Sequence, residues 1–317
     1  MALAFTFPGQ GSQFIGMGHA LSEAFPSAKA VFEEVDSVLG QNLSKIMWEG
    51  PIEDLTLTSN TQPALMSCSI AAMRALKAEF GVDITVAKYV AGHSLGEYSA
   101  LCAAGAIDLS TTTKLLRIRG DAMQAAVPVG KGAMAALLGA SVEDAEAAAA
   151  IGMKVGICQI ANDNAIGQIV LSGEVAAVKA AADAARELGV KKAVILPVSA
   201  PFHCDMMKPA AEAMERALAD AVIIAPRVPV VNNMTARPVT DPDQIRADLV
   251  SQVTGRVRWR ESILWMFEDE GITRMDEPGC GKVLSVMRRR IVKSIEGGPV
   301  DSPESLEAFA KYINGDV

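Results

Sequence analysis

The chain has 317 residues, which is long enough to bury a substantial core and to form one large α/β domain with an insertion. A formal charge of −8 and an aromatic content of 5% argue against nucleic-acid binding, which relies on basic surfaces and stacking platforms. No apolar run reaches the length of a membrane span, and no basic segment precedes the first apolar residues as it would in a signal peptide. We therefore expect a soluble protein that binds neither nucleic acid nor membrane.

The cysteines and histidines limit the chemistry further. The five cysteines are scattered, odd in number and without a C-x-x-C pair, so we expect reduced thiols in a cytoplasmic protein. The three histidines are not spaced as a metal-binding pair, and we expect no metal site.

The first third of the chain alternates strand and helix. The pattern predicts a strand over 4–7, a polar glycine loop, and a series of helices that ends near Phe80. A short buried strand over 87–91 and a helix over 97–104 follow. This order is typical of an α/β fold.

Between residues 128 and 197 the rhythm changes to β-α-β-β-α-β, the ferredoxin-like signature. The predicted strands and helices lie at 133–138, 142–151, 155–161, 168–171, 175–188 and 193–196. Turn-forming residues flank this stretch on both sides. We therefore predict a ferredoxin-like domain over 128–197, inserted into an α/β-hydrolase-like domain made of residues 1–127 and 198–317.

After the insertion the α/β pattern returns. The predicted elements are helices over 207–218, 243–252 and 262–270, an extended segment over 228–232, and a strand and turn over 273–279.

The stretch Gly92-His93-Ser94-Leu95-Gly96 has the G-x-S-x-G form of a nucleophile elbow. It stands between a predicted strand and a predicted helix, which is the context that the motif requires. A serine in this sharp turn presents its hydroxyl beyond the sheet edge, where the N-terminus of the helix favours an oxyanion. Ser94 is therefore the predicted nucleophile; the alternative is a glycine-rich loop with an incidental serine.

A serine nucleophile needs a general base, and His203 is the best candidate. It follows a predicted strand and a turn at Pro201, where its side chain can be aimed at the elbow. The alternative is a purely structural histidine. His93 competes for the role, but its side chain is expected to point away from Ser94, which favours a supporting position beneath the site.

Four separated motifs become recognisable when they are taken together. They are Pro8-Gly9-Gln10-Gly11-Ser12-Gln13, Gly92-His93-Ser94-Leu95-Gly96-Glu97-Tyr98-Ser99-Ala100-Leu101, Arg117-Ile118-Arg119-Gly120 with Met123-Gln124, and Pro201-Phe202-His203. The set resembles the malonyl-CoA:acyl-carrier-protein transacylases of fatty-acid synthesis and the acyltransferase domains of polyketide synthases. The resemblance covers essentially the whole chain in order, including the inserted domain.

The resemblance implies catalytic roles for the matching residues. Ser94 would take the acyl group, and His203 would remove its proton. Gln10 and the N–H of Leu95 would form the oxyanion hole. The family orients this histidine through a backbone carbonyl near a glutamine, and Gln252 matches that position.

The resemblance also implies how the substrate is held. Arg119 would bind the free carboxylate of a malonyl group, because a guanidinium matches a carboxylate bidentately, whereas the nearby Arg117 is expected to be a solvated charge. Asn162 matches an active-site asparagine of the family, with a turn residue as the alternative. Phe202 is expected to limit branching at the acyl α-carbon, and Gln252 is likewise expected to take part in substrate binding.

Two positions depart from the family pattern. Ile166 and Cys280 stand where the family commonly has proline. Neither change removes a catalytic group, so both bear on the rigidity of loops around the acyl-donor cleft. Cys280 is either an accessible thiol or, as is more common for a free cysteine, a buried one.

The resemblance thus implies an [acyl-carrier-protein] S-malonyltransferase. Malonyl-CoA would acylate Ser94, and the phosphopantetheine thiol of acyl carrier protein would then take the malonyl group in a ping-pong reaction. We expect no cofactor beyond the substrate malonyl-CoA, and we expect a monomer. Because carrier proteins are usually acidic, Lys191, Lys192 and Arg288–Arg290 are candidates for a basic docking patch.

Three alternatives remain at this point. One is an acyltransferase that serves a polyketide synthase, and another is an esterase of the α/β-hydrolase type. In that class the histidine lies close to the C-terminus, whereas His203 is in the middle of the chain. The third is a non-catalytic subunit that only binds the carrier protein, which the combination of Ser94, His203 and Arg119 argues against.

Overall fold

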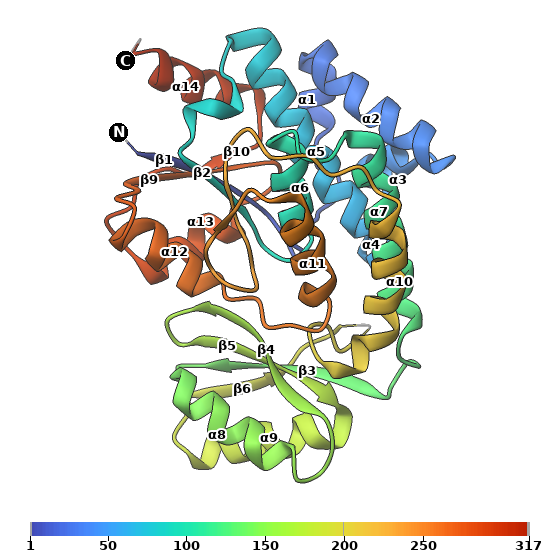
Figure 1. The fold of residues 1–317 in the computed structure, drawn as a ribbon, viewed down its shortest axis with the longest axis vertical. Coiled ribbons are helices and arrows are strands. Elements are labelled where there is room, and N and C mark those ends of the chain that lie inside the picture. Colours follow the sequence, from blue (N-terminus) through green and yellow to red (C-terminus); the bar gives the residue numbers. More distant parts are fainter. Residues whose placement is uncertain (1, 199, 316–317) are drawn as a thin grey trace.

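The computed structural model describes residues 2–198 and 200–315, which form a large region around one sheet and a smaller region around another (Figure 1). The strands of the large sheet are β1 (Leu3–Phe7), β2 (Tyr89–Gly92), β7 (Val230–Val231), β8 (Pro238–Val239), β9 (Arg274–Pro278) and β10 (Pro299–Val300). They lie in the order β10-β9-β1-β2-β7-β8, and all neighbours are parallel except β7 and β8. The carboxyl ends of β1, β2 and β7 therefore meet at one edge.

Helices cover both faces of this sheet. Their bounds are α1 (His19–Ala24), α2 (Pro26–Leu39), α3 (Leu43–Glu49), α4 (Ile52–Thr56), α5 (Thr58–Phe80), α6 (Gly96–Ala103), α7 (Leu109–Ala125), α10 (Lys208–Ala219), α11 (Pro242–Gln252), α12 (Trp259–Glu268), α13 (Val283–Ile291) and α14 (Pro303–Asn314). Short 3₁₀ turns are η1 (Ile84–Val86) and η2 (Asp205–Met207). The predicted helix over 262–270 thus begins earlier, at Trp259, and ends at Glu268.

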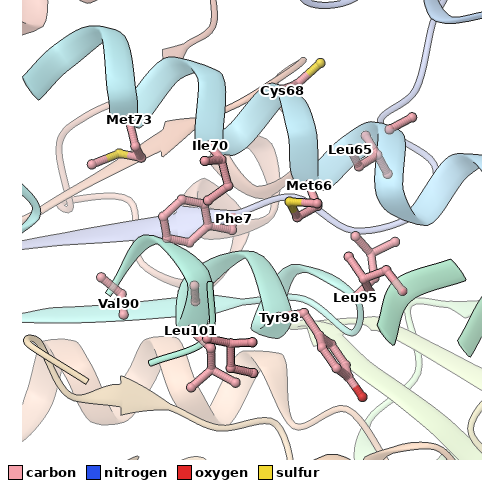
Figure 2. Close-up of a cluster of buried hydrophobic side chains, with 14 of the residues drawn as sticks. Phe7, Leu65, Met66, Cys68, Ile70, Met73, Val90, Leu95, Tyr98 and Leu101 are labelled. Atoms are coloured by element: carbon pink, nitrogen blue, oxygen red, sulfur yellow. The ribbon is translucent and has the colours of Figure 1, made fainter. Parts of the chain in front are cut away.

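Alternation along β1 explains why the sheet is buried on both faces. Leu3, Phe5 and Phe7 belong to the core that contains α5, whereas Ala4 belongs to a separate core with residues of α12 and α13. Figure 2 shows Ile70 of α5 directly beside Phe7. Because most residues of α5 are buried, this helix lies inside the large region rather than on its surface.

The smaller region contains a four-stranded antiparallel sheet (lower part of Figure 1). Its elements are β3 (Gly132–Leu138), α8 (Val142–Gly152), β4 (Cys158–Ala165), β5 (Gln168–Glu174), α9 (Val175–Glu187) and β6 (Lys192–Ile195). The strand order β4-β5-β3-β6 and the β-α-β-β-α-β succession are those of a ferredoxin-like fold. Helices α8 and α9 cover the face that points away from the large sheet.

Strand β4 differs from its sequence prediction. It begins at Cys158 rather than at 155 and continues to Ala165, so Asn162 lies on a strand and not in a turn. Register shifts along β4 accommodate its polar residues, and Asn162 also forms a parallel bridge with Val257. The end of β4 does not show the alternation of apolar and polar residues that predicts a strand, because this part of β4 also pairs with the large region.

The same strand joins the two regions. The Asp163 N–H donates to the Val257 carbonyl at 2.9 Å, and the Val257 N–H donates to Ala161 at 2.8 Å. The fully buried Asp163 carboxylate accepts hydrogen bonds from Arg256 and Arg260. The small sheet is therefore held against the segment that precedes α12 and against the first turn of that helix.

Among the described residues, the longest apolar stretches of helix all fall short of what crossing a bilayer requires.

Candidate active site

The elbow that carries Ser94 depends on its two glycines. A Cβ on Gly92 would lie 1.9 Å from the carbonyl carbon of Gly96, and a Cβ on Gly96 would lie 2.3 Å from the Phe7 carbonyl oxygen. Neither position can therefore hold a larger residue without moving backbone. Ser94 itself has a φ of 54°, a strained conformation for a non-glycine residue that this tight turn imposes.

His203 faces the serine from the segment between the small sheet and α10. The Ser94 Oγ and His203 Nε2 are 2.8 Å apart, and His203 Nδ1 lies 2.9 Å from the carbonyl oxygen of Gln252. Gln252 is the last residue of α11, where carbonyls lack a partner within the helix. Because that carbonyl can only accept, Nδ1 carries the proton and Nε2 is left to accept the serine proton.

The surroundings keep this imidazole neutral. Burial, and second the positive charge of Arg119, lower the pKa of His203 to about 3. The hydrogen bond to the Gln252 carbonyl acts in the opposite direction and is the weaker influence. A neutral ring is the form that can act as a general base.

Arg119 comes from α7 and places its guanidinium at the nucleophile. Its Nη2 donates to Ser94 Oγ at 3.1 Å and to Gln252 Oε1 at 2.9 Å, and its Nη1 donates to Gln62 Oε1 at 2.8 Å. The residue is only 1% exposed, and burial lowers its pKa from the usual arginine value. Ser94 Oγ thus lies between a base and a fixed cation.

Residues without a predicted role hold this arrangement from beneath. The Asn233 side chain accepts from the Ser94 N–H at 2.7 Å and donates to the Gly92 carbonyl at 2.7 Å. Glu97 accepts from the Gln252 amide at 2.8 Å and from the Asn233 N–H at 3.0 Å. Asn233 lies two residues after β7 at the carboxyl edge beside β2, a position that the rule for open α/β sheets marks as functional.

The N-terminus of α6 offers donors beside Ser94. Within the described chain the Leu95 N–H, just before α6, has no hydrogen-bond acceptor. Gln10 follows β1 on the glycine loop, is exposed, and lines the same cavity. Its side chain lies 3.5 Å from the Thr58 hydroxyl, so it is only weakly engaged elsewhere.

A cavity of about 600 Å³ opens over these groups and is lined by both regions of the protein. The lining includes Gly9, Gln10, Gln62, His93, Ser94, Leu95, Arg119, Met123, Met134, Asn162, Asn164, Val170, Leu196, Phe202, His203, Leu284 and Met287. Asn162 and Phe202 both line this cavity. Gln252 is not among the lining residues, because its fully buried side chain lies behind Arg119.

His93 supports the cavity wall rather than the serine. Its Nε2 lies 2.8 Å from Asn164 Oδ1, and its ring packs edge-on against Trp259. Burial lowers the pKa of His93, so this ring is also neutral.

Two surface expectations are corrected by the structure. Arg117 is half-buried and donates to Asn60 and Gln41, so it bridges elements rather than standing solvated. Arg288 is buried and donates to the carbonyls of Glu296 and Gly297, which removes it from the docking candidates. Lys191, Lys192, Arg289 and Arg290 are exposed.

The two departures from the family pattern differ in their surroundings. Cys280 is 1% exposed, and a hydrogen bond with Cys68, together with burial, raises the pKa of its thiol well above the usual value. It is therefore the buried alternative, not an accessible thiol. Ile166 is 64% exposed at the turn between β4 and β5.

Comparisons with known proteins agree with this geometry. A family model described as acyl transferase domain matches residues 4–276. The malonyl CoA-acyl carrier protein transacylase of Bacillus subtilis (strain 168) is 45% identical over 309 residues, covering 96% of this chain and 95% of the relative.

Solved structures extend the likeness to three dimensions. An acyl-carrier-protein S-malonyltransferase from Bartonella henselae matches with a TM-score of 0.96 and 53% identity, covering 99% of this chain and 100% of that one. A malonyl-transacylase solved with a type II polyketide acyl-carrier protein matches with a TM-score of 0.94 and 38% identity, covering 98% and 100%. With the family model and these relatives in agreement over nearly its full length, the chain belongs to the malonyl CoA-acyl carrier protein transacylases of the acyl transferase domain family.

Proposed function

We propose that the protein moves a malonyl group from malonyl-CoA to the phosphopantetheine thiol of an acyl carrier protein through a malonyl ester on Ser94. His203 takes the Ser94 proton as Oγ attacks the thioester carbonyl, and it returns this proton to the departing CoA thiolate. In the second half, His203 takes the proton of the carrier thiol, whose sulfur attacks the ester carbonyl. The proton then goes back to Ser94 Oγ as the ester bond breaks.

One observation carries this proposal: Ser94 Oγ lies within hydrogen-bond distance of both His203 Nε2 and Arg119 Nη2. A serine with only a base would suit any ester or thioester. A buried guanidinium at the same oxygen adds a partner for a carboxylate a few atoms from the reacting carbonyl. Malonyl has its free carboxylate at that place, whereas acetyl has none.

The remaining residues have proposed roles around these three. The Leu95 N–H, which has no acceptor in the described chain, and Gln10 would stabilise the oxyanion of the tetrahedral intermediate. The Gln252 carbonyl would orient His203, while Asn162 and Phe202, which line the cavity, would contact the acyl group.

Several broader features belong to the same proposal. The relative solved with a carrier protein supports acyl carrier protein as the second substrate. Serine, histidine and arginine supply the nucleophile, the base and the carboxylate partner, so we propose that the reaction needs no metal or bound cofactor. We propose separately that the protein is a cytoplasmic monomer. We also propose that 128–197 is an inserted domain within 1–127 and 198–317, supported by the separate small-sheet core.

Intact mass after incubation with malonyl-CoA tests the function. The transferase gains one malonyl group, loses it when holo acyl carrier protein is added, and passes it to the carrier. Ser94→Ala is expected to abolish the adduct with the fold unchanged by circular dichroism. Free malonate without carrier loading would instead indicate an esterase, and neither adduct nor hydrolysis would indicate a binding subunit.

A further inference from the structure

Glu97 has no part in the reaction described above, yet it is buried directly beneath the reacting groups. It lies in the first turn of α6, three residues after Ser94, and is 2% exposed. A single oxygen, Oε2, accepts both the Gln252 side-chain amide at 2.8 Å and the Asn233 N–H at 3.0 Å. A carboxyl group in such a place is costly to bury, which directs attention to what it holds.

The Gln252 side chain has one acceptor end and one donor end, and each meets the matching partner. Its Oε1 accepts from Arg119 Nη2 at 2.9 Å, while its Nε2 donates to Glu97 and, at 3.0 Å, to the Ser94 carbonyl. In the flipped orientation, the amide N–H groups would face a guanidinium that can only donate, and Oε1 would face two acceptors. Glu97 therefore stabilises the one orientation in which Gln252 can hold Arg119.

The second contact of Glu97 reaches the elbow. It accepts the backbone N–H of Asn233, whose side chain in turn holds the Ser94 N–H and the Gly92 carbonyl. One carboxyl oxygen thus connects the turn that presents the serine with the amide that positions the arginine.

We propose that Glu97 is a positioning residue that acts through Gln252 to aim Arg119 at the acyl group, and so sets the preference for an acyl donor that carries a carboxylate. This inference rests on the proposed function. Acetyl transfer uses the same serine and histidine, but an acetyl group has no carboxylate for Arg119 to hold, so loss of Glu97 affects acetyl transfer less than malonyl transfer.

The role requires an acceptor oxygen at this place, and the negative charge is secondary. Glu97→Gln keeps an oxygen that can accept both hydrogen bonds, whereas Glu97→Ala leaves the Gln252 and Asn233 donors without it. We expect Glu97→Ala to lower the rate of malonyl acylation by roughly tenfold to hundredfold, with a clearly smaller fall for acetyl-CoA. Glu97→Gln is expected to keep the malonyl-to-acetyl ratio within about threefold of the original, since both hydrogen bonds remain.

The experiment measures acylation rates with malonyl-CoA and acetyl-CoA for Glu97→Ala, Glu97→Gln, Gln252→Met and the double variant Glu97→Ala/Gln252→Met. If Glu97 acts through Gln252, the double variant has the same substrate ratio as Gln252→Met alone. Asp276→Ala is the matched control, because Asp276 is an equally buried carboxylate paired with Arg274 outside the cavity. It is expected to lose thermal stability without a change in the ratio.

Equal falls for the two thioesters in Glu97→Ala, or a Glu97→Gln variant as impaired as Glu97→Ala, would overturn the inference. If Glu97→Ala does not fold, Gln252→Met still tests the inference. An unchanged malonyl-to-acetyl ratio in that variant would show that Gln252 does not position Arg119. Absence of a malonyl adduct on the unmodified protein would instead count against the proposed function itself.

Discussion

The residues that line the cavity fall into two chemically different sets, which we call the reactive wall and the apolar wall. The reactive wall consists of Ser94, His203 and Arg119, and each of these side chains is fixed by hydrogen bonds to the others or to residues beneath. The apolar wall consists of Met134, Val170, Leu196 and Phe202, which contribute shape and no charge.

The difference indicates how the work is divided between them. On the reactive wall a lost contact leaves a buried polar group without a partner, and the reacting geometry is lost with it. On the apolar wall a smaller side chain leaves space that another acyl group can occupy. We therefore expect changes to the reactive wall to alter rates by orders of magnitude, and changes to the apolar wall to alter only the ratio between substrates.

The largest graded effect is expected at His203. His203→Ala removes the proton acceptor 2.8 Å from Ser94 Oγ, and the rate of acylation should fall by about 10² to 10⁴. The measurement is single-turnover formation of the malonyl adduct by intact mass. A variant that keeps native circular dichroism and the original acylation rate would show that another group is the base.

Arg119 tests whether the reactive wall also chooses the substrate. A malonyl carboxylate that enters the buried site without its partner should lose roughly 2–5 kcal/mol of interaction, which is about one and a half to three and a half orders of magnitude in rate. Arg119→Ala should show this loss with malonyl-CoA, while acetyl transfer holds or rises because the site becomes more apolar.

Arg119→Lys separates charge from geometry in the same assay. A lysine restores a cation but cannot reproduce the guanidinium that reaches Gln62, Gln252 and Ser94 together, so only partial rescue is expected. An equal fall for malonyl and acetyl in Arg119→Ala would instead assign this residue to the fold or to chemistry shared by both substrates.

Ser94 and the elbow were predictable from sequence because the information is local. Gly92, Ser94 and Gly96 form a recognisable motif within five residues, and a Cβ on Gly92 would collide with the backbone of Gly96 inside that turn. The collision at Gly96 is with Phe7 of β1, but the motif spacing already records it. The roles of Glu97 and Asn233 were not predictable in this way. Their contacts join residues more than a hundred positions apart, and no periodicity records such a meeting.

The prediction that Arg288 belongs to a docking patch was wrong for a different reason, because the spacing of apolar residues in α13 already indicates that Arg288 is buried. Leu284, Arg288 and Ile291 are spaced i, i+4, i+7 and share one buried face of α13. This period separates the buried Arg288 from the exposed Arg289 and Arg290 in the same run of three arginines. The prediction for β4 failed for a physical reason, since its polar residues pair with Val257 of the large region and do not follow simple alternation.

Phe202 tests the apolar wall. The side chain is 9% exposed and lines the cavity just before His203, so Phe202→Ser should open space beside the acyl α-carbon. One added methyl group is worth only about 1–3 kcal/mol, and we expect partial relaxation toward methylmalonyl-CoA with a much smaller change in the malonyl rate. Competition between the two thioesters measures the ratio, and an unchanged ratio would remove Phe202 from the acyl pocket.

The smallest expected effect is the response of acylation to pH. Burial and the neighbouring Arg119 charge lower the pKa of His203 to about 3, so the cationic ring is disfavoured and the neutral base persists as the pH falls. Between pH 8 and pH 5 we expect the acylation rate to change by less than about twofold. A histidine with the ordinary pKa near 6.5 would be neutral in only about 3% of molecules at pH 5, which would slow acylation about thirtyfold.

Glu97 titrates within the same range, because burial raises its pKa to about 7. Its protonation leaves an oxygen that can still accept from Gln252 and Asn233, so it should not add a large step to the profile. Single-turnover acylation across this range, on the original protein and on Glu97→Gln, separates the two groups. A steep loss centred near pH 6.5 in both would show that His203 is solvated during the reaction, whereas a loss near pH 7 that disappears in Glu97→Gln would show that the charge of Glu97 matters to the reactive wall.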